Sequence, residues 1–378
     1  MPQVPGDRAT WFSTLATLSL AAAALAIGPA PASVQQADEG RGPAVEVELQ
    51  FPLGLAQHPD GALYVSERRA HRVQRIDLER GTAEVIAGTG ERGFSGDGGP
   101  ASEAELGCPD SIDMDGAGNL YIADRCNERI RRVDAGTGII TTIAGNGVRG
   151  TAPDGPGLTM PLQGVYYVRV LNDRELLFAE TDAHRIRVLD LESGFVRTVA
   201  GSGEEGFSGD GGAAADAAFS RPHVALYTAN GDLLIGDSGN QRIRRVDAET
   251  GVISTVAGSG AQGVAEDGAA ALEAPFSYFG EIHESEDGDL LFTEWSSGRV
   301  LRLDLDAGIL EVLAGTNDEA TPSADGGVPL STRFGPLADL VIDEEGRLLV
   351  VAANEGAIRR IDLAAGTVET LAGRPNSR

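Results

Sequence analysis

The sequence contains no lysine. All 30 of its basic residues are arginines, and with 57 acidic residues its formal net charge is −27. Without lysine, the protein cannot form a Schiff base or use a lysine as a general base. A chain this acidic has no basic surface for nucleic acid, and anionic membranes repel it. We therefore expect neither nucleic acid nor a membrane surface as a partner.

Long hydrophobic runs are also scarce. The run from Leu15 to Ile27 has about 13 apolar residues, whereas a membrane-spanning helix needs about 20. It follows Arg8 and precedes Ala30-Pro31-Ala32, an order typical of a secretory signal peptide. We predict a signal peptide over 1–32, cleaved after Ala32, with an uncleaved anchor as the alternative. The protein is then secreted or periplasmic, and it does not insert in the membrane after cleavage.

The rest of the chain is dominated by one motif that recurs six times. Each copy ends in Ala-Gly, and successive Ala-Gly pairs are 56 to 58 residues apart. Each copy also has an aspartate followed four residues later by glycine, which is typical of a tight turn. A fixed period of this length indicates a repeat architecture. The copies span about 52–88, 109–145, 164–201, 222–258, 279–315 and 336–373.

The segments between the turns are short and rich in β-branched residues, such as Leu120–Ala123 and Arg129–Val133. They are too short for helices and predict four antiparallel strands in each copy. Four-stranded sheets repeated around an axis form a β-propeller. We therefore predict an all-β, six-bladed propeller over 44–378, after a disordered leader at 33–43. The alternating residues 45–49 are a further strand candidate for sealing the ring.

The chain has two cysteines, Cys108 and Cys126, which a propeller places on the same face. Exported proteins usually pair such cysteines, so we predict a disulfide rather than a metal or redox site. Closing a loop of 18 residues stabilises the fold by about 3 kcal/mol.

Two sets of repeated acidic residues lie in the loops of one face. In the first set, an aspartate precedes glycine, which indicates either a tight turn or a carboxylate crown for Ca²⁺. In the second set, an acid is followed five residues later by arginine, which favours a structural ion pair. The first set is Asp97, Asp154, Asp210, Asp267 and Asp325; the second is Glu67/Arg72, Asp124/Arg129, Glu180/Arg185, Asp237/Arg242 and Glu294/Arg299.

Polar residues interrupt the first strand of several repeats, where the propeller predicts an apolar segment facing the central channel. Catalytic or metal-ligand candidates are Asp110, Asp113, His223, Glu281 and His283, and ligand-binding candidates are Tyr166 and Arg169. Imidazole and carboxylate groups converging on a channel suit acid–base chemistry or binding of Zn or Ca. No nucleophile, phosphate-binding or dinucleotide motif accompanies them.

Two segments, Tyr121–Ile130 and Leu234–Ile243, resemble the NHL repeat, with its Asp, Asn and Arg-Ile positions. The loop Gly93–Ala101 is similar to loops of exported bacterial NHL proteins and of the teneurin NHL segment. The resemblance implies a six-bladed propeller, and NHL propellers bind proteins, RNA or ligands, while a few are enzymes. In the amidating lyases of this fold, channel histidines hold zinc; the matching positions here include His223, but also Asp110 and Leu337.

These observations favour an exported module without catalysis that binds a protein or small ligand through its loop-bearing face. The alternative is a metal-assisted lyase or hydrolase at the channel mouth, with the candidates above as its ligands and acid–base groups.

Overall fold

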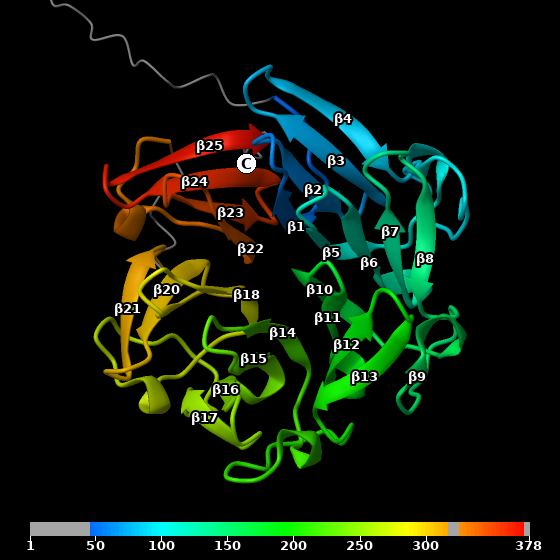
Figure 1. Cartoon of the computed structure of the whole chain (residues 1–378). Helices are drawn as coiled ribbons and strands as arrows, with labels where there is room; N and C mark the ends of the chain where they lie inside the picture. Colours follow the sequence, from blue (N-terminus) through cyan, green and yellow to red (C-terminus); the bar gives the residue numbers. More distant parts are fainter. Residues whose placement is uncertain (1–45, 317–324, 374–378) are drawn as a thin grey trace, which may run out of the picture. The chain divides into compact units, whose positions relative to one another are not determined.

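The computed structural model describes residues 46–316 and 325–373. The predicted signal peptide over 1–32 and the leader over 33–43 lie outside these residues. Within the described ranges, six β-sheets follow one another along the chain and form a ring (Figure 1). The six-bladed β-propeller predicted from the repeats is therefore confirmed, with four antiparallel strands from each repeat.

Each blade pairs its strands in sequence order, from the inner strand at the ring centre to the outer strand (Figure 1). The third blade gains a two-residue strand on its outer edge, β9 (Gly155–Pro156). The strands are β1 (Pro52–Gln57), β2 (Leu63–Glu67), β3 (Arg72–Asp77), β4 (Thr82–Ala87), β5 (Pro109–Met114), β6 (Leu120–Asp124), β7 (Arg129–Val133), β8 (Ile140–Ala144), β10 (Val165–Asn172), β11 (Glu175–Glu180), β12 (Arg185–Asp190), β13 (Phe195–Ala200), β14 (Pro222–Tyr227), β15 (Leu233–Asp237), β16 (Arg242–Val246), β17 (Ile253–Ala257), β18 (Phe279–Glu284), β19 (Leu290–Glu294), β20 (Arg299–Asp304), β21 (Ile309–Ala314), β22 (Leu337–Ile342), β23 (Leu348–Ala352), β24 (Ala357–Asp362) and β25 (Thr367–Gly373).

Short 3-10 helices occupy the connections. They are η1 (Ala101–Glu103), η2 (Arg125–Asn127), η3 (Gly157–Thr159), η4 (Thr181–Ala183), η5 (Ala214–Asp216), η6 (Ser238–Asn240), η7 (Ala271–Glu273) and η8 (Pro329–Ser331). No helix in the described ranges is both long and apolar enough to cross a membrane.

The recurring Ala-Gly pair marks a close approach at the end of each outer strand. Gly145 has a φ of +89°, and a Cβ there would collide with the carbonyl oxygen of Glu128. Only glycine adopts this conformation without strain and allows that contact. The preceding Ala144 is fully buried. The pair therefore fixes how the outer strand leaves the sheet, which explains its presence in every repeat.

The ring closes by packing rather than by strand exchange. The sixth blade takes all four of its strands from its own repeat, and β22 and β23 contact β1 of the first blade. Residues 46–49 are not in a strand, so the expectation of a sealing strand is wrong for them. Instead Leu49 is buried with Leu55 and Val351 in an apolar cluster shared by the first and last blades. The closure is thus hydrophobic.

A β-bulge near the start of every inner strand positions the channel residues. Each inner strand pairs with the second strand of its blade, and the register of this pairing shifts by one residue. The shift lies between the first residue of the inner strand and its third or fourth residue. Successive residues of a regular strand point to opposite faces, but a bulge redirects one of them. The second and third residues of an inner strand can therefore both face the channel, as Asp110 and Ser111 do.

Candidate functional site

A cavity of about 430 Å³ lies where the inner strands begin. Second and third residues of the inner strands form its walls, among them Asp110, Tyr166, His223, Glu281 and Asp339. Loop residues of the same face complete its rim, namely Arg68, Arg221, Gln241, Gln262, Tyr278, Trp295 and Ser296. We call this cavity the channel mouth.

A second cavity, of about 180 Å³, lies further along the inner strands and is called here the inner chamber. Asp113, Arg169 and His283, the fifth residues of their strands, line it. Ser111, Tyr167, Glu281 and Asp339 border both cavities. The structure thus divides the candidate residues: Asp110, Tyr166 and His223 face the mouth, Asp113, Arg169 and His283 face the chamber, and Glu281 lies between.

A hydrogen-bonded cluster separates the two cavities and joins the third blade to the fifth. Arg169 Nη1 donates to the Tyr167 hydroxyl at 3.0 Å and to Glu281 Oε1 at 3.1 Å, and that hydroxyl donates to Glu281 Oε1 at 3.0 Å. Burial raises the pKa of Glu281 to about 7, although Arg169 opposes the rise. Burial also raises the pKa of Asp339 well above its usual range, and the nearby Glu281 adds to the effect. The channel centre therefore holds carboxyl groups that are readily protonated.

The chamber candidates hold neighbouring blades together. Asp113 accepts a hydrogen bond from the Val170 backbone N–H at 2.7 Å, from the second blade to the third. Asp339 accepts from the Leu55 N–H at 2.8 Å, from the sixth blade to the first. His283 hydrogen-bonds the backbone of the sixth blade, and burial lowers its pKa to about 3. Cohesion of the ring accounts for these residues without a ligand.

The mouth candidates differ because two of their buried polar atoms make no hydrogen bond within the described residues. Asp110 Oδ2 and His223 Nδ1 are buried, and neither makes a hydrogen bond to any described residue. Burial raises the pKa of Asp110 to about 7 and lowers that of His223 to about 4. A carboxylic acid and a neutral imidazole therefore coexist near neutral pH. Buried polar groups without partners are uncommon and mark positions where a bound molecule can complete the hydrogen bonding.

Aromatic rings surround the unpartnered atoms. The ring of His223 lies edge-on to Tyr166, with centroids 5.9 Å apart, and to Tyr278 at 5.1 Å. Trp295 lies edge-on to Phe51 at 6.1 Å, which fixes its orientation at the rim. An enclosed site with aromatic walls and a few polar atoms is typical of small-molecule binding.

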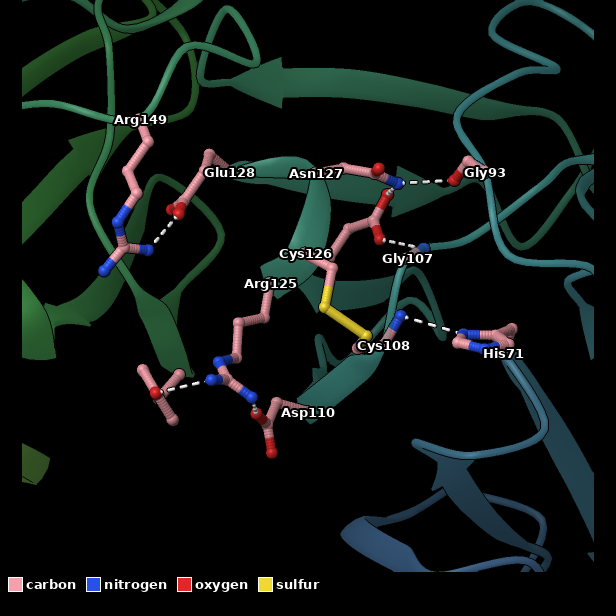
Figure 2. The surroundings of a disulfide bond; sticks show 12 residues. His71, Gly93, Gly107, Cys108, Asp110, Arg125, Cys126, Asn127, Glu128 and Arg149 are labelled. Atoms are coloured by element: carbon pink, nitrogen blue, oxygen red, sulfur yellow. Dashed lines mark hydrogen bonds and ion pairs between the residues drawn. A yellow bond between two sulfur atoms is a disulfide. The ribbon is translucent and has the colours of Figure 1, made fainter.

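The predicted disulfide between Cys108 and Cys126 is present, with Cα atoms 5.4 Å apart. Figure 2 shows that it joins the start of β5 to η2, beside the residues that shape the mouth. Arg125, next to Cys126, donates to the Tyr166 hydroxyl at 2.6 Å and lies 3.6 Å from Asp110 Oδ2. The disulfide therefore fixes one wall of the mouth.

The aspartates that precede glycine in the loops act as latches within each blade. Asp97 accepts hydrogen bonds from Arg131 of β7 at 2.8 Å and from Thr142 of β8 at 2.7 Å. Asp210 repeats the arrangement with Arg244 and Thr255. Contacts with the outer two strands also hold Asp154, Asp267 and Asp325. Within the described residues, no group of three or more His, Cys, Asp or Glu side chains is placed to hold a metal ion.

The predicted acid–arginine pairs form where the acid is a glutamate. The distances are 2.9 Å for Glu67/Arg72, 3.1 Å for Glu180/Arg185 and 2.7 Å for Glu294/Arg299. Glu180 also pairs with Arg187, seven residues later, at 2.9 Å. The prediction is wrong for the two aspartates, whose shorter side chains pair only with the arginine seven residues later. These pairs are Asp124/Arg131 at 3.2 Å and Asp237/Arg244 at 3.5 Å.

The arginines left over by the aspartates stack on the aromatic residues of the loops. The guanidinium of Arg129 lies 3.6 Å from the ring centroid of Phe94, and that of Arg242 lies 3.9 Å from Phe207. Phe94 and Phe207 are thus exposed stacking partners of arginines rather than plugs between blades.

Several mouth residues were not predicted from the sequence. Arg68 and Trp295 occupy the same repeat position, directly after the acid that ends the second strand, and Arg221 and Tyr278 both directly precede an inner strand. Asp339 is the third residue of the sixth inner strand, as Glu281 is of the fifth. Comparing these positions between repeats would have found them, because all are variable sites in an otherwise regular pattern.

Residues 55–168 match the Teneurin NHL domain family. Together with the six-bladed ring, this match makes the chain similar to NHL-repeat β-propellers.

Relatives of this propeller are much longer proteins. It is 28% identical over 274 residues to Protein SUPPRESSOR OF QUENCHING 1, chloroplastic, of Arabidopsis thaliana, across 68% of this chain and 25% of that protein. It is 26% identical over 284 residues to Teneurin-1 of Mus musculus, across 51% of this chain and 10% of that protein. The chain thus spans a quarter or less of these relatives.

Solved structures agree on the fold of the propeller. An auxiliary nutrient binding protein from Bacteroides thetaiotaomicron has a TM-score of 0.60 and 16% sequence identity, with 85% of this chain and 70% of that chain covered. This likeness concerns the fold alone, so the function must be argued from the site.

Proposed function

We propose that this propeller is an exported binding module that holds a small polar ligand in its channel mouth. The observation that carries the proposal is the pair of buried atoms that make no hydrogen bond to any described residue, Asp110 Oδ2 and His223 Nδ1, in a cavity of about 430 Å³. Leaving such groups unsatisfied costs about 1–3 kcal/mol each, and a ligand that hydrogen-bonds to them recovers this energy. The aromatic rim supplies apolar contact area.

Export is supported by two independent features. The N-terminal residues have the order of a signal peptide, and the disulfide between Cys108 and Cys126 belongs in an oxidising compartment. The propeller then encounters its ligand outside the cytoplasm.

Trp295 provides a direct assay for the proposed site. The sequence has two tryptophans, and Trp11 lies in the predicted signal peptide. Cleavage removes Trp11, and in uncleaved protein Trp11→Phe likewise leaves Trp295, at the rim of the mouth, as the reporter. We expect a panel of small polar metabolites to contain at least one that changes this fluorescence saturably and raises the melting temperature. A ligand at 100 times its Kd stabilises a protein by about 2.7 kcal/mol.

Two histidine variants decide where such a ligand binds. We expect His223→Ala to weaken binding at least about tenfold, whereas His58→Ala leaves it unchanged, because His58 lies in the turn after β1 and stacks on Tyr64. If no compound perturbs Trp295, or if His223→Ala binds as well as the wild type, then the ligand site is not the channel mouth. A protein that docks on the loop face without perturbing Trp295 would be such an outcome.

One observation favours a second function, catalysis at the same site. Asp110 and His223 line one cavity, and burial shifts their pKa values in opposite directions, to about 7 and about 4. Such a pair suits proton transfer in a lyase or hydrolase. The metal-assisted form of this reaction would need further ligands beyond these two residues. Mass spectrometry of the bound ligand after incubation separates the two functions, because a binding module returns it unchanged.

A further inference from the structure

The chemistry of the channel mouth also indicates which ligand it accepts, provided that the proposed ligand site is correct. Arg68 is half-buried at the rim, and its guanidinium makes no hydrogen bond or ion pair with any residue that the structure describes. The other arginines nearby already donate to protein side chains, although Arg125 Nη1 makes no hydrogen bond to a described residue. Arg221 donates to Asp182 at 2.6 Å, and Arg125 donates to the Tyr166 hydroxyl. Arg68 is therefore the guanidinium available to an anion.

The carboxyl groups of the mouth do not cancel this charge. Asp110, Glu281 and Asp339 are buried, and burial raises the pKa of each. Burial thus reduces the negative charge of these carboxyl groups near neutral pH, while an arginine keeps its charge. The mouth is therefore locally cationic in a protein whose formal net charge is −27. Guanidinium groups bind carboxylates through paired hydrogen bonds, which makes a carboxylate the matching anion.

The unpartnered atoms require a different group on the same ligand. His223 hydrogen-bonds the Gly280 backbone in a way that favours the protonated ring, so the imidazole donates this bond. The neutral ring then has its remaining nitrogen, Nδ1, as an acceptor, and it needs a donor from the ligand. Asp110 Oδ2 needs a donor when ionised and an acceptor when protonated. A hydroxyl group can donate to His223 and can serve Asp110 in either state.

The rim supplies a flat apolar surface for the remainder of the ligand. Trp295 and Tyr278 border the same cavity as His223, and Trp295 is held by Phe51. An aromatic face can cover a ring whose C–H groups point to one side. The ligand thus combines one carboxylate, several hydroxyl groups and one flat face.

We propose that the channel mouth binds a sugar acid. Its carboxylate pairs with Arg68, its hydroxyl groups hydrogen-bond to His223 Nδ1 and Asp110 Oδ2, and its ring packs against Trp295. A hexuronate is a compact molecule with this set of groups.

Three probes test the proposal by titration against Trp295 fluorescence in the Trp11→Phe protein. They are D-glucuronate, D-glucose, which replaces the carboxylate by a hydroxymethyl group, and benzoate, which keeps the carboxylate and a flat ring but has no hydroxyl groups. We expect glucuronate to bind at least tenfold more tightly than either of the others. Equal binding of glucose, or tighter binding of benzoate, would overturn the proposal.

Two arginines give a matched pair of variants. We expect Arg68→Gln to weaken glucuronate binding at least tenfold and to leave glucose unchanged, which removes the preference for the acid. Arg69 is not a suitable control, because it stacks on Phe51, which contacts Trp295. The control is Arg80→Gln, at an exposed arginine that pairs with Asp77 and does not line the mouth, and it should change neither affinity by more than twofold. An unchanged preference in Arg68→Gln refutes the role of this arginine.

The outcome separates this inference from the proposed function. If some other compound binds and depends on His223, whereas glucuronate, galacturonate and gluconate do not bind, then the mouth is a ligand site but not one for sugar acids. If no compound depends on His223, then the proposed function itself is wrong.

Discussion

Replacing Asp110 by asparagine should make the protein more stable at alkaline pH. Burial raises the pKa of this carboxyl from its usual value of 3.8 to about 7. Because the folded pKa exceeds the unfolded one, the folded state binds a proton that the unfolded state has released between these values. The stability associated with Asp110 is therefore full below about pH 4 and is lost as pH rises to about 7.

The size of the effect follows from the shift. A difference of about 3 pKa units, at 1.36 kcal/mol per unit, gives about 4 kcal/mol between pH 4 and pH 8. Asparagine has almost the same shape and does not ionise. We therefore expect Asp110→Asn to match the wild type at pH 4 and to exceed its free energy of unfolding at pH 8 by a few kcal/mol.

A nearby arginine opposes the effect of burial on Asp110, so the sign of the stability difference shows which of the two dominates. Arg125 lies 3.6 Å from Asp110, and an ion pair with it would favour the ionised carboxylate. That distance is too long for a hydrogen bond, and neither Asp110 Oδ2 nor Arg125 Nη1 makes one to any described residue, so we expect burial to dominate. Denaturant unfolding at pH 4, 6 and 8 measures the difference. Asp173→Asn, in an exposed turn, is the control. If Asp110→Asn is less stable than the wild type at pH 8, the ion pair dominates and the reasoning is refuted.

The remaining predictions concern the frame around the site. The native protein should show no thiol that reacts with Ellman's reagent, and reduction of Cys108 and Cys126 should cost about 3 kcal/mol of stability; two reactive thiols in the untreated protein would contradict the disulfide. Arg131→Met should cost about 3–5 kcal/mol, because it leaves the buried Asp124 carboxylate without its arginine. Arg132→Met, which breaks a surface pair, should cost less than about 1 kcal/mol. Equal costs for these two variants, measured by denaturant unfolding, would show that burial of the Arg131 pair is not what matters.

The repeat predicts the fold well because every blade satisfies the same local rules. Turn glycines and β-branched runs at a fixed period determine the strands, and residues such as Ala144 and Gly145 have the same role in every copy. The site is harder to predict. Period-two alternation places Asp110 and Ser111 on opposite faces of a strand, and the bulge that turns both toward the channel has no signature in the sequence.

Long-range pairing limits the sequence argument further. Arg169 and Glu281 are 112 residues apart, and only the closed ring shows that they form a cluster that divides the channel. Side-chain length matters equally at short range. Glu180 reaches both the arginine five residues later and the one seven residues later, whereas Asp124, with one methylene less, forms an ion pair only with the one seven residues later. A pattern of residue types predicts that an acid and an arginine pair in each blade, but not which arginine is used.

A division of roles between repeat positions follows from these contacts. Positions that recur between blades, such as the five loop aspartates, accept hydrogen bonds from the strands of their own blade. Ring closure brings the positions that differ between blades to a common centre, so that Arg68, Asp110, His223 and Trp295 each contribute one group of different chemistry. An asymmetric ligand can be recognised only by such differences, because six identical groups around an axis would bind it equally in six orientations. The departures from the repeat therefore determine specificity, while the repeat provides the rigid ring that holds them in place.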